Sequence, residues 1–245
     1  MNDSLLYVEN LSAKYGESQV VHDASFHVNQ GEVVTLLGRN GAGKTTTLRA
    51  IMGVLQTREG SIRFNGKEII SLSSDQIARC GIGYVPEERG IFSSLTVKEN
   101  LMLPPVISDN PMTLDEIYSL FPNIRERLDS RGTHLSGGEQ QMLAMARILR
   151  TGANFLLLDE PTEGLAPIII DAIANVIKML KARGTTILLV EQNSRFASQV
   201  ADRHYVFQEG AIVNEFTNQE VLDNPAQVER YLSIEVVQEE EGSHV

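Results

Sequence analysis

Three runs of consecutive apolar residues predict the strands of a buried sheet. They are 33–37 (VVTLL), 155–158 (FLLL) and 187–190 (ILLV), and each run is followed by glycine or acidic residues. Strands that are covered on both faces are apolar along their whole length, as in parallel sheets. The carboxyl ends of such strands form the edge of the sheet where ligands bind. The residues that follow these runs are therefore the first candidates for a functional site.

Shorter stretches with alternating apolar and polar residues predict antiparallel strands in the N-terminal part. They cover residues 5–13, 25–28, 61–64 and 67–70. The last two are separated by Asn65-Gly66, which favours a tight hairpin turn because both positions adopt positive φ readily. The N-terminal part is therefore expected to be partly antiparallel.

Two helices are predicted between the apolar strands, one at 44–52, after the first glycine-rich loop, and one at 168–181, from apolar residues at helical spacing. The second helix begins at Pro167, ends before Gly184, and carries a buried stripe of four residues: Ile170, Ile173, Ile177 and Leu180. Thr217 and Glu220 match the capping-box pattern at the start of another short helix. Strands that alternate with helices in this way are typical of an α/β fold.

The segment between Glu88 and Arg150 differs from the rest of the chain. Prolines interrupt polar helical stretches, and no strong strand pattern occurs: Pro104, Pro105, Pro111 and Pro122. We interpret this segment as an inserted helical subdomain. The expected organisation is one domain over residues 1–235, with its core in 1–87 and 151–235, the insert at about 88–150, and an acidic flexible tail at 236–245.

Length, composition and charge exclude several classes. The 245 residues, with 42% apolar and 22% charged side chains, suit one globular domain rather than a disordered chain. The net charge of −11 disfavours non-specific binding to nucleic acid or to an anionic membrane surface, so no nucleic-acid partner is expected. The longest apolar runs are too short to span a membrane. Cys80, the single cysteine, is expected to be a small buried hydrophobic residue in a cytosolic protein.

The first glycine-rich segment matches a phosphate-binding loop. Residues 38–45 fit G-x-x-x-x-G-K-[ST], after a predicted strand and before a predicted helix. The backbone N–H groups of such a loop surround phosphate oxygens, the lysine adds a positive charge, and the threonine hydroxyl can bind Mg²⁺. The candidate nucleotide-binding residues here are Gly38, Asn40, Gly41, Ala42, Gly43, Lys44, Thr45 and Thr46. Lys44 also counts as catalytic because it can stabilise charge in the transition state.

A pair of carboxylates follows the second apolar run. Asp159 and Glu160 would lie at the ligand-binding edge of the sheet. In P-loop enzymes the aspartate at this position holds Mg²⁺, and a following carboxylate can orient or deprotonate the attacking water. Asp159 is therefore a candidate metal ligand, together with Thr45, and Glu160 is the candidate general base.

A second glycine motif, LSGGEQQ at 135–141, separates this chain from kinases and small GTPases. Ser136 and Glu139 match a capping box, and an apolar helix face follows: Met142, Met145, Ala146 and Leu149. Gly137 and Gly138 would allow an anion to approach the first turn of this helix closely. The candidate phosphate-binding residues of this motif are therefore Ser136, Gly137 and Gly138.

These motifs together resemble the ATP-binding subunits of ABC transporters, from about Leu5 to Leu232. The resemblance implies a P-loop fold of the ABC type: a mainly parallel core sheet, an N-terminal antiparallel β subdomain and an inserted helical subdomain. It also implies a head-to-tail dimer, in which ATP lies between the glycine loop of one subunit and the serine-glycine-glycine turn of the other. Tyr15 and Val20 match the position that stacks on adenine.

Three positions depart from the usual family pattern. Glu87 stands where most members have a glutamine, which implies a carboxylate and a candidate ligand beside the metal site. Ala166 ends the loop at 163–166, where an aspartate usually contacts the other subunit. Gln192 replaces a histidine that reaches the γ-phosphate. Gln192 can donate a hydrogen bond but does not titrate near neutral pH, and it is counted among the catalytic candidates.

With these departures, the chain resembles one branch of the family, the smaller ATPase subunit of importers of branched-chain amino acids. The resemblance is carried by GRNGAGKTTT, GIGYVPEERGIF, LSGGEQQMLA, DEPTEGLAP and TILLVEQN. It implies ATP and Mg²⁺ as cofactors, and a location in the cytoplasm on the inner face of the membrane. The implied partners are a larger paralogous ATPase or a second copy, two membrane permeases and, indirectly, an external substrate-binding protein.

Two alternatives stay open at this point. A non-transport ABC ATPase that regulates a membrane partner would have nearly the same cassette. An importer ATPase for another small polar substrate, such as urea or amides, would also match these motifs.

Overall fold

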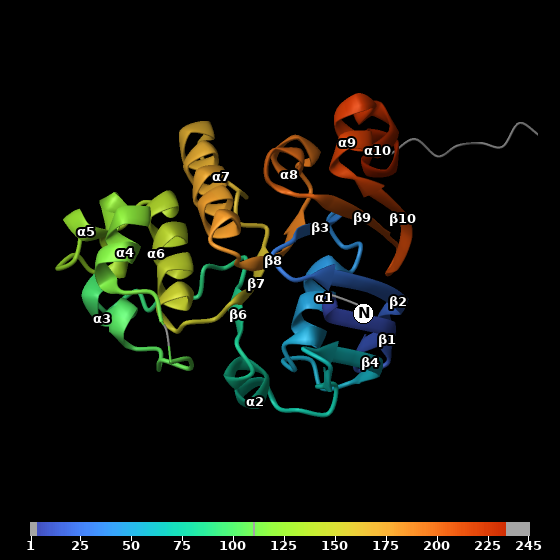
Figure 1. Ribbon diagram of the computed structural model, residues 1–245, viewed down its shortest axis with the longest axis horizontal. Helices are drawn as coiled ribbons and strands as arrows, with labels where there is room; N and C mark the ends of the chain where they lie inside the picture. Colours follow the sequence, from blue (N-terminus) through green and yellow to red (C-terminus); the bar gives the residue numbers. More distant parts are fainter. Residues whose placement is uncertain (1–3, 110, 234–245) are drawn as a thin grey trace, which may run out of the picture.

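The computed structural model describes residues 4–109 and 111–233, arranged around two β-sheets (Figure 1). The predicted acidic tail at 236–245 lies outside the described residues. The boundaries predicted for the helical insert, at about residues 88 and 150, remain predictions.

The first sheet is antiparallel and belongs to the N-terminal part, as predicted. Its strand order is β2-β1-β4-β5, from the strands β1 (Ser4–Tyr15), β2 (Ser18–Asn29), β4 (Arg58–Phe64) and β5 (Lys67–Glu68). The hairpin between β4 and β5 is confirmed, with φ of 49° at Asn65 and 74° at Gly66. Strand β2 begins seven residues before the predicted Ser25, because several polar residues on its exposed side hide the alternation.

The second sheet forms the core and contains the three apolar runs. Its order is β10-β9-β3-β8-β7-β6, from β3 (Val33–Gly38), β6 (Ile82–Val85), β7 (Phe155–Asp159), β8 (Thr186–Glu191), β9 (Arg203–Gln208) and β10 (Ala211–Thr217). All neighbouring pairs are parallel except β9 with β10 at the edge. The carboxyl ends of β3, β7 and β8 therefore lie side by side.

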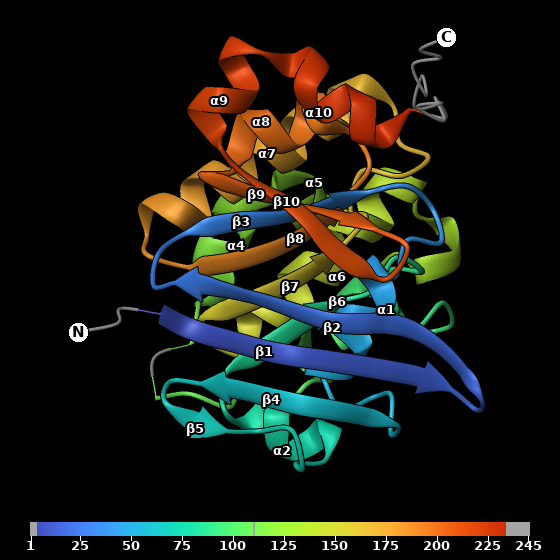
Figure 2. The same cartoon turned by 90° about the vertical axis from the view of Figure 1, so that its right-hand side faces the viewer.

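Alternate residues of the core strands face two different apolar layers. Val34 and Leu36 pack between the two sheets, where helix α1 (Lys44–Ile51) contacts strands of both. Figure 2 shows the antiparallel sheet as the outer layer on that side. Leu156 and Leu158 face the opposite layer, which contains helix α6 (Gly137–Arg150) and helix α7 (Pro167–Ala182). The core strands are thus covered on both faces, which explains their continuous apolar runs.

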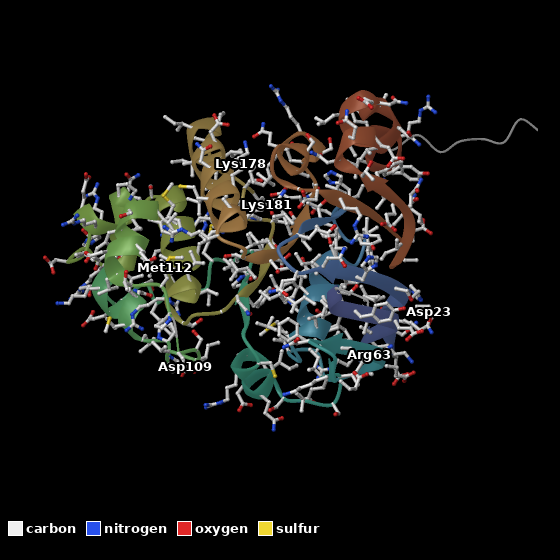
Figure 3. The ribbon with its side chains drawn as sticks, viewed as in Figure 1. Asp23, Arg63, Asp109, Met112, Lys178 and Lys181 are labelled. Atoms are coloured by element: carbon white, nitrogen blue, oxygen red, sulfur yellow. The ribbon has the colours of Figure 1, made fainter. Side chains whose placement is uncertain are left out.

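The elements between residues 97 and 150 are helical, as the fold class predicts. Besides α6, they are α3 (Val97–Met102), α4 (Leu114–Leu120), α5 (Pro122–Glu126) and a 3₁₀ turn (Gly132–His134). Figure 3 places Asp109 and Met112 in this region, at the opposite end of the molecule from Asp23 and Arg63 on the antiparallel sheet. The remaining helices are α2 (Ser74–Arg79), α8 (Ser194–Val200), α9 (Asn218–Asp223) and α10 (Pro225–Leu232). None of the helices described is long and apolar enough to cross a lipid bilayer.

The expectation for Cys80 is wrong, because its side chain is exposed. Cys80 is the residue that caps the short helix α2, and Gly81 with φ of 100° turns the chain into β6 immediately afterwards. The buried residue of α2 is Ile77. A helix of six residues has a single buried face, and Cys80 lies beyond it.

Candidate active site

The phosphate-binding motif forms the loop between β3 and α1. Gly38, the last residue of β3, lies so close to β9 that an added Cβ would be 2.4 Å from the carbonyl oxygen of Phe207. Gly43 caps α1 with φ of 108°, a conformation that favours glycine. Gly38 holds the start of the loop against the sheet, and Gly43 joins the end of the loop to the N-terminus of α1. The backbone N–H groups at this end carry a partial positive charge.

Lys44 is buried, with 3% of its surface exposed, and its ammonium group points back over the loop. Nζ donates hydrogen bonds to the carbonyl oxygens of Gly38, at 2.8 Å, and Arg39, at 2.9 Å. It also forms an ion pair with Oε1 of Glu160 at 3.2 Å. The structure therefore brings together the predicted lysine and the predicted general base. Phosphate oxygens would compete for this ammonium group with its partners in the chain.

Asp159 and Thr45 are also in contact. The Oγ1 of Thr45 donates to Oδ1 of Asp159 at 2.8 Å, and the hydroxyl of Tyr84 donates to Oδ2 at 2.9 Å. Burial raises the pKa of Asp159, and the two hydrogen bonds oppose that shift. Burial and the nearby Asp159 carboxylate raise the pKa of Tyr84, so this hydroxyl keeps its proton as a donor. Sequence reasoning did not assign a role to Tyr84, since its hydrogen bond joins two strands.

This set of oxygen atoms fits a magnesium ion. Mg²⁺ prefers oxygen ligands and usually takes one or two from the protein, with water and substrate phosphates completing the shell. Thr45 and Asp159 supply a hydroxyl and a carboxylate. Glu87 supplies a second carboxylate, because it lines the cavity over the glycine loop together with Thr45. Among the described residues, no cluster of three or more histidine, cysteine or acidic side chains forms a protein-only metal site. A site that depends on substrate phosphates agrees with that result.

Glu160 occupies a conformation that few non-glycine residues adopt. Its φ is 43°, and its N–H donates to the carbonyl oxygen of Val190 at 3.0 Å. Oε2 accepts a hydrogen bond of 2.8 Å from Nε2 of Gln192, which also donates to Oδ1 of Asn40 at 2.6 Å. Gln192 thus joins the carboxylate to the glycine loop. The two side chains predicted to act on the γ-phosphate and its water are direct neighbours.

A cavity of about 270 Å³ lies over the loop. Its lining consists of residues predicted from the sequence as nucleotide, metal or catalytic candidates: Val20, Asn40, Gly41, Gly43, Lys44, Thr45, Thr46, Glu87 and Glu160. The backbone of Ala42 accepts a hydrogen bond from the N–H of Gly210 behind the loop. A second cavity of about 310 Å³ begins at Glu160 and continues along Gln192.

The predicted residues outside that lining are Gly38, Ala42, Asp159 and Gln192, which belong to the loop or contact its neighbours, and two further groups, the serine-glycine-glycine turn and Tyr15. Ser136, Gly137 and Gly138 begin α6 in the helical region, and Ser136 is exposed as its N-cap. The predicted capping box is confirmed, because Ser136 N–H donates to Glu139 Oε2 at 2.7 Å and Glu139 N–H donates to Ser136 Oγ at 3.3 Å. Tyr15 ends β1 with 43% of its surface exposed. Its hydroxyl, next to Arg49 on α1, raises the pKa of that guanidinium group.

Two further carboxyl groups, those of Glu163 and Glu191, line the second cavity together with Glu160. Burial and the neighbouring Glu160 and Glu87 raise the pKa of Glu163. Burial also raises the pKa of Glu191 to about 7. Sequence reasoning gave no role to these two carboxyl groups, because their environment is created by loops that meet only in the folded chain.

Comparison with known proteins agrees with this arrangement. The family model described as ABC transporter matches residues 21–163. The chain belongs to the ABC transporter family. Members of the family bind and hydrolyse ATP, so this chain is an ABC ATPase, as the motifs predicted.

Two curated relatives cover almost the whole chain. The high-affinity branched-chain amino acid transport ATP-binding protein BraG of Pseudomonas aeruginosa is 45% identical over 93% of this chain and 99% of its own length. The lipopolysaccharide export system ATP-binding protein LptB of Haemophilus influenzae is 39% identical over 93% of this chain and 96% of its own length. Branched-chain amino acid transport and lipopolysaccharide export are therefore both represented among the ABC relatives.

Solved ABC cassettes share the fold. A nucleotide-free ATP-binding cassette from an ABC transporter is 27% identical and superposes with a TM-score of 0.80, covering 94% of this chain and 99% of that structure. The ADP conformation of the cassette MJ1267 superposes with a TM-score of 0.78, at 27% identity and the same coverage. The predicted fold class is confirmed.

Proposed function

We propose that this chain is the ATP-hydrolysing subunit of a membrane importer for the branched-chain amino acids leucine, isoleucine and valine. The observation that carries the proposal is its similarity to BraG, at 45% identity over nearly the full length of both chains. The import substrate would be selected by other subunits. This chain would supply the energy through ATP.

ATP would bind in the cavity over the glycine loop, with adenine against Tyr15. Lys44 would exchange its contacts with the chain for phosphate oxygens and stabilise the charge that develops during transfer. Glu160 would then align water with the γ-phosphate and accept its proton, and Gln192 would donate a hydrogen bond at the same place. The contact between Glu160 and Gln192 supports this division of roles.

Thr45, Asp159 and Glu87 would hold Mg²⁺, which supplies positive charge to the β- and γ-phosphate oxygens when it is bound. Tyr84 would keep Asp159 oriented through its hydrogen bond of 2.9 Å.

A second subunit would complete the site. Ser136, Gly137 and Gly138 are presented at the start of α6, away from the cavity of their own chain, and would contact ATP bound to a paralogous subunit or to a second copy. The binding of ATP would then close the dimer, and hydrolysis would open it.

Two permeases would transmit this motion across the membrane, with the chain on its cytoplasmic face. Exposed apolar side chains on and around α3 support a docking surface there, since grouped apolar side chains on a surface mark interaction sites, whereas scattered ones do not: Phe92, Met102, Leu103 and Val106. An external substrate-binding protein would deliver the amino acid. No nucleic-acid partner is proposed.

The test is transport in proteoliposomes that contain the chain, its permeases and the binding protein encoded beside it. ATP-dependent uptake of leucine, isoleucine and valine is expected, and urea, amides and other amino acids serve as control substrates. ATP hydrolysis without uptake of the three amino acids would contradict the substrate but not the ATPase.

The similarity to LptB supports a second candidate, a lipopolysaccharide exporter ATPase. The two candidates differ in the membrane partner. Pull-down from detergent-solubilised membranes with the intact chain would recover amino-acid permeases in the first case and lipopolysaccharide-export permeases in the second.

A further inference from the structure

One buried carboxylate next to the candidate active site has no role in the proposed hydrolysis. Glu191 is the last residue of β8, and 3% of its surface is exposed. Its Oε1 accepts a hydrogen bond of 2.7 Å from the hydroxyl of Thr162, which is also buried. Its Oε2 accepts from the backbone N–H groups of Gln192, at 3.2 Å, and Asn193, at 3.4 Å.

These contacts join the two loops that carry the active side chains. Thr162 lies two residues after Glu160, in the loop that follows β7. Gln192 directly follows Glu191, and its side chain donates to Glu160 Oε2 at 2.8 Å. The contacts form a closed ring, from Glu191 to Thr162, along the chain to Glu160, across to Gln192 and back. Such a ring restricts both loops at once.

Glu160 needs this kind of restraint. Its backbone has φ of 43°, and a residue in that region stays there only where its surroundings hold it. The backbone bond to Val190 holds the N–H of Glu160, and Thr162 holds the chain on its far side. Without the Thr162 contact, the chain after Glu160 would lose its buried attachment to β8.

We propose that Glu191 is a positioning residue, which fixes the directions of Glu160 and Gln192 through its hydrogen bonds to Thr162 and to the backbone of Gln192. It acts through these neighbours and does not touch the nucleotide. The inference rests on the proposed role of Glu160 as the general base.

The surroundings of Glu191 make this contact sensitive to pH. Glu160 and Glu163 from the loop after β7 line the same cavity, and Lys44 on α1 pairs with Glu160. The uncharged neighbours are Thr162, Gln192 and Asn193, which donate to Glu191, together with Leu37, opposite Glu191 in the sheet, and Ile170 on α7. Burial raises the pKa of Glu191 to about 7, although the hydrogen bonds that it accepts work against the shift.

Ionised Glu191 can accept all of these hydrogen bonds. Once protonated, the carboxyl group has one donor oxygen and no charge, so it accepts fewer hydrogen bonds from Thr162 and the two N–H groups, and those that remain are weaker than bonds to a carboxylate. The positioning effect should therefore strengthen as the pH rises from 6 to 8, because Glu191 loses its proton in that range.

The experiment compares ATP hydrolysis by the full chain, by four variants and by Glu160→Gln, over a range of MgATP concentrations up to saturation, between pH 6 and 8. Glu191→Gln replaces the charged carboxylate by a neutral amide, in which only one of the two terminal atoms can accept hydrogen bonds. Thr162→Val removes the hydroxyl that donates to Glu191. Thr162→Ser keeps that hydroxyl, and Glu229→Gln neutralises an exposed carboxylate on α10 as a control. Binding of a fluorescent ATP analogue is measured in parallel.

At pH 8, Glu191→Gln and Thr162→Val should lower kcat about tenfold, as expected for the loss of a hydrogen bond to a charged group, with less than a twofold change in KM and in analogue binding. Thr162→Ser and Glu229→Gln should stay within about twofold of the wild type. With a pKa of about 7, about a tenth of Glu191 is ionised at pH 6 and about nine tenths at pH 8, so the ratio of wild-type kcat to Glu191→Gln kcat should increase about fivefold over this range. Because both proteins hydrolyse the same ATP, the titration of ATP itself cancels in this ratio.

A ratio that does not change with pH would overturn the inference, as would a Thr162→Ser variant impaired as strongly as Thr162→Val. Parallel loss of analogue binding and kcat in Glu191→Gln would also overturn it, since that pattern indicates general structural damage. Glu160→Gln is included to separate the two proposals. If Glu160→Gln hydrolyses ATP at the wild-type rate, the general-base role fails, whatever the result for Glu191.

Discussion

The glycine loop and the serine-glycine-glycine turn are both glycine-rich segments at the start of a helix, but their surroundings differ. Around the glycine loop, Lys44, Asp159 and Glu160 are buried and contact other side chains or carbonyl oxygens from several strands. Ser136 is exposed, and its hydrogen bonds stay within the first turn of its own helix.

This difference indicates how the two segments work. Buried charged groups that neighbouring strands already hold in place need only exchange partners when a substrate binds, without moving far. An exposed helix start with a local cap has no such support from its own chain. The first segment therefore has the features of a preformed site, and the second has those of a surface that acts on another subunit. The following predictions test this contrast, from the largest effect to the smallest.

Replacing the candidate general base should have the largest effect. Glu160→Gln keeps the size of the side chain but removes the group that accepts a proton from water. The kcat for ATP hydrolysis should fall about 1,000-fold, while ATP still binds and holds dimers together. Phosphate release and light scattering with ATP measure the two properties. Unchanged hydrolysis would remove Glu160 from this role.

Loss of the loop lysine should act on binding. Lys44→Ala removes a charge-assisted contact with phosphate and leaves Glu160 without its cationic partner, so the Kd for ATP should rise roughly 30-fold. The control is Lys178→Ala, an exposed lysine on α7 that Figure 3 shows away from the glycine loop. Isothermal titration with both variants gives the comparison. Equal affinities would show that the glycine loop binds phosphate without this charge.

The serine turn should affect hydrolysis without affecting the first binding step. Ser136→Ala is expected to lower kcat about tenfold and to leave the Kd of the monomer for ATP within about twofold of the wild type. Loss of the cap should also reduce the free energy of unfolding by about 1 kcal/mol.

A mixing experiment makes this prediction sharper. A dimer of one Ser136→Ala subunit and one Lys44→Ala subunit contains one site with an intact glycine loop and an intact turn. Mixed subunits should therefore hydrolyse ATP faster than either variant alone. Lack of any gain on mixing would contradict the two-subunit site.

The smallest expected effect concerns stability and pH. The folded protein raises the pKa of Glu191 to about 7, so between the ordinary glutamate value of about 4.3 and pH 7 the folded state binds more protons than the unfolded state. The wild type is therefore destabilised at this residue as the pH rises through that window. Glu191→Gln removes the titration, and its Tm relative to the wild type should increase by roughly 4 °C from pH 5 to pH 8.

Scanning calorimetry at several pH values measures this difference. Glu229→Gln, exposed on α10, should show no such trend. A difference in Tm that is independent of pH would show that Glu191 is not held in its protonated form by burial.

Continuous apolar runs and glycine motifs were enough to predict three central strands of the core sheet, β3, β7 and β8, its main helices and the candidate residues around the cavity. Strand β9 was not predicted, because Arg203, His204 and Tyr205 give it a polar composition. Within the fold, Arg203 pairs with Glu32 at 2.8 Å, and the ring of His204 contacts Thr35 at 2.7 Å. These polar residues are satisfied by tertiary contacts, which a local pattern cannot reveal.

The same reason explains what was missed at the site. Lys44, Asp159 and Glu160 belong to motifs, and local sequence identifies them. Tyr84 contacts Asp159 only when β6 and β7 lie side by side. Thr162, in the loop after β7, contacts Glu191 only when β7 and β8 lie side by side. The exposure of Cys80 follows from the end of the six-residue helix α2 at Arg79, one residue before it. Caps and turns set the ends of such elements, and hydrophobicity does not reveal them.

That position has a practical consequence. Cys80 is the single cysteine of the sequence, and its side chain is exposed at the end of α2. A maleimide dye would therefore attach at one known place, without removing any native thiol. Two labelled subunits, one with a donor and one with an acceptor dye, would report their approach and separation by energy transfer as ATP is added and consumed.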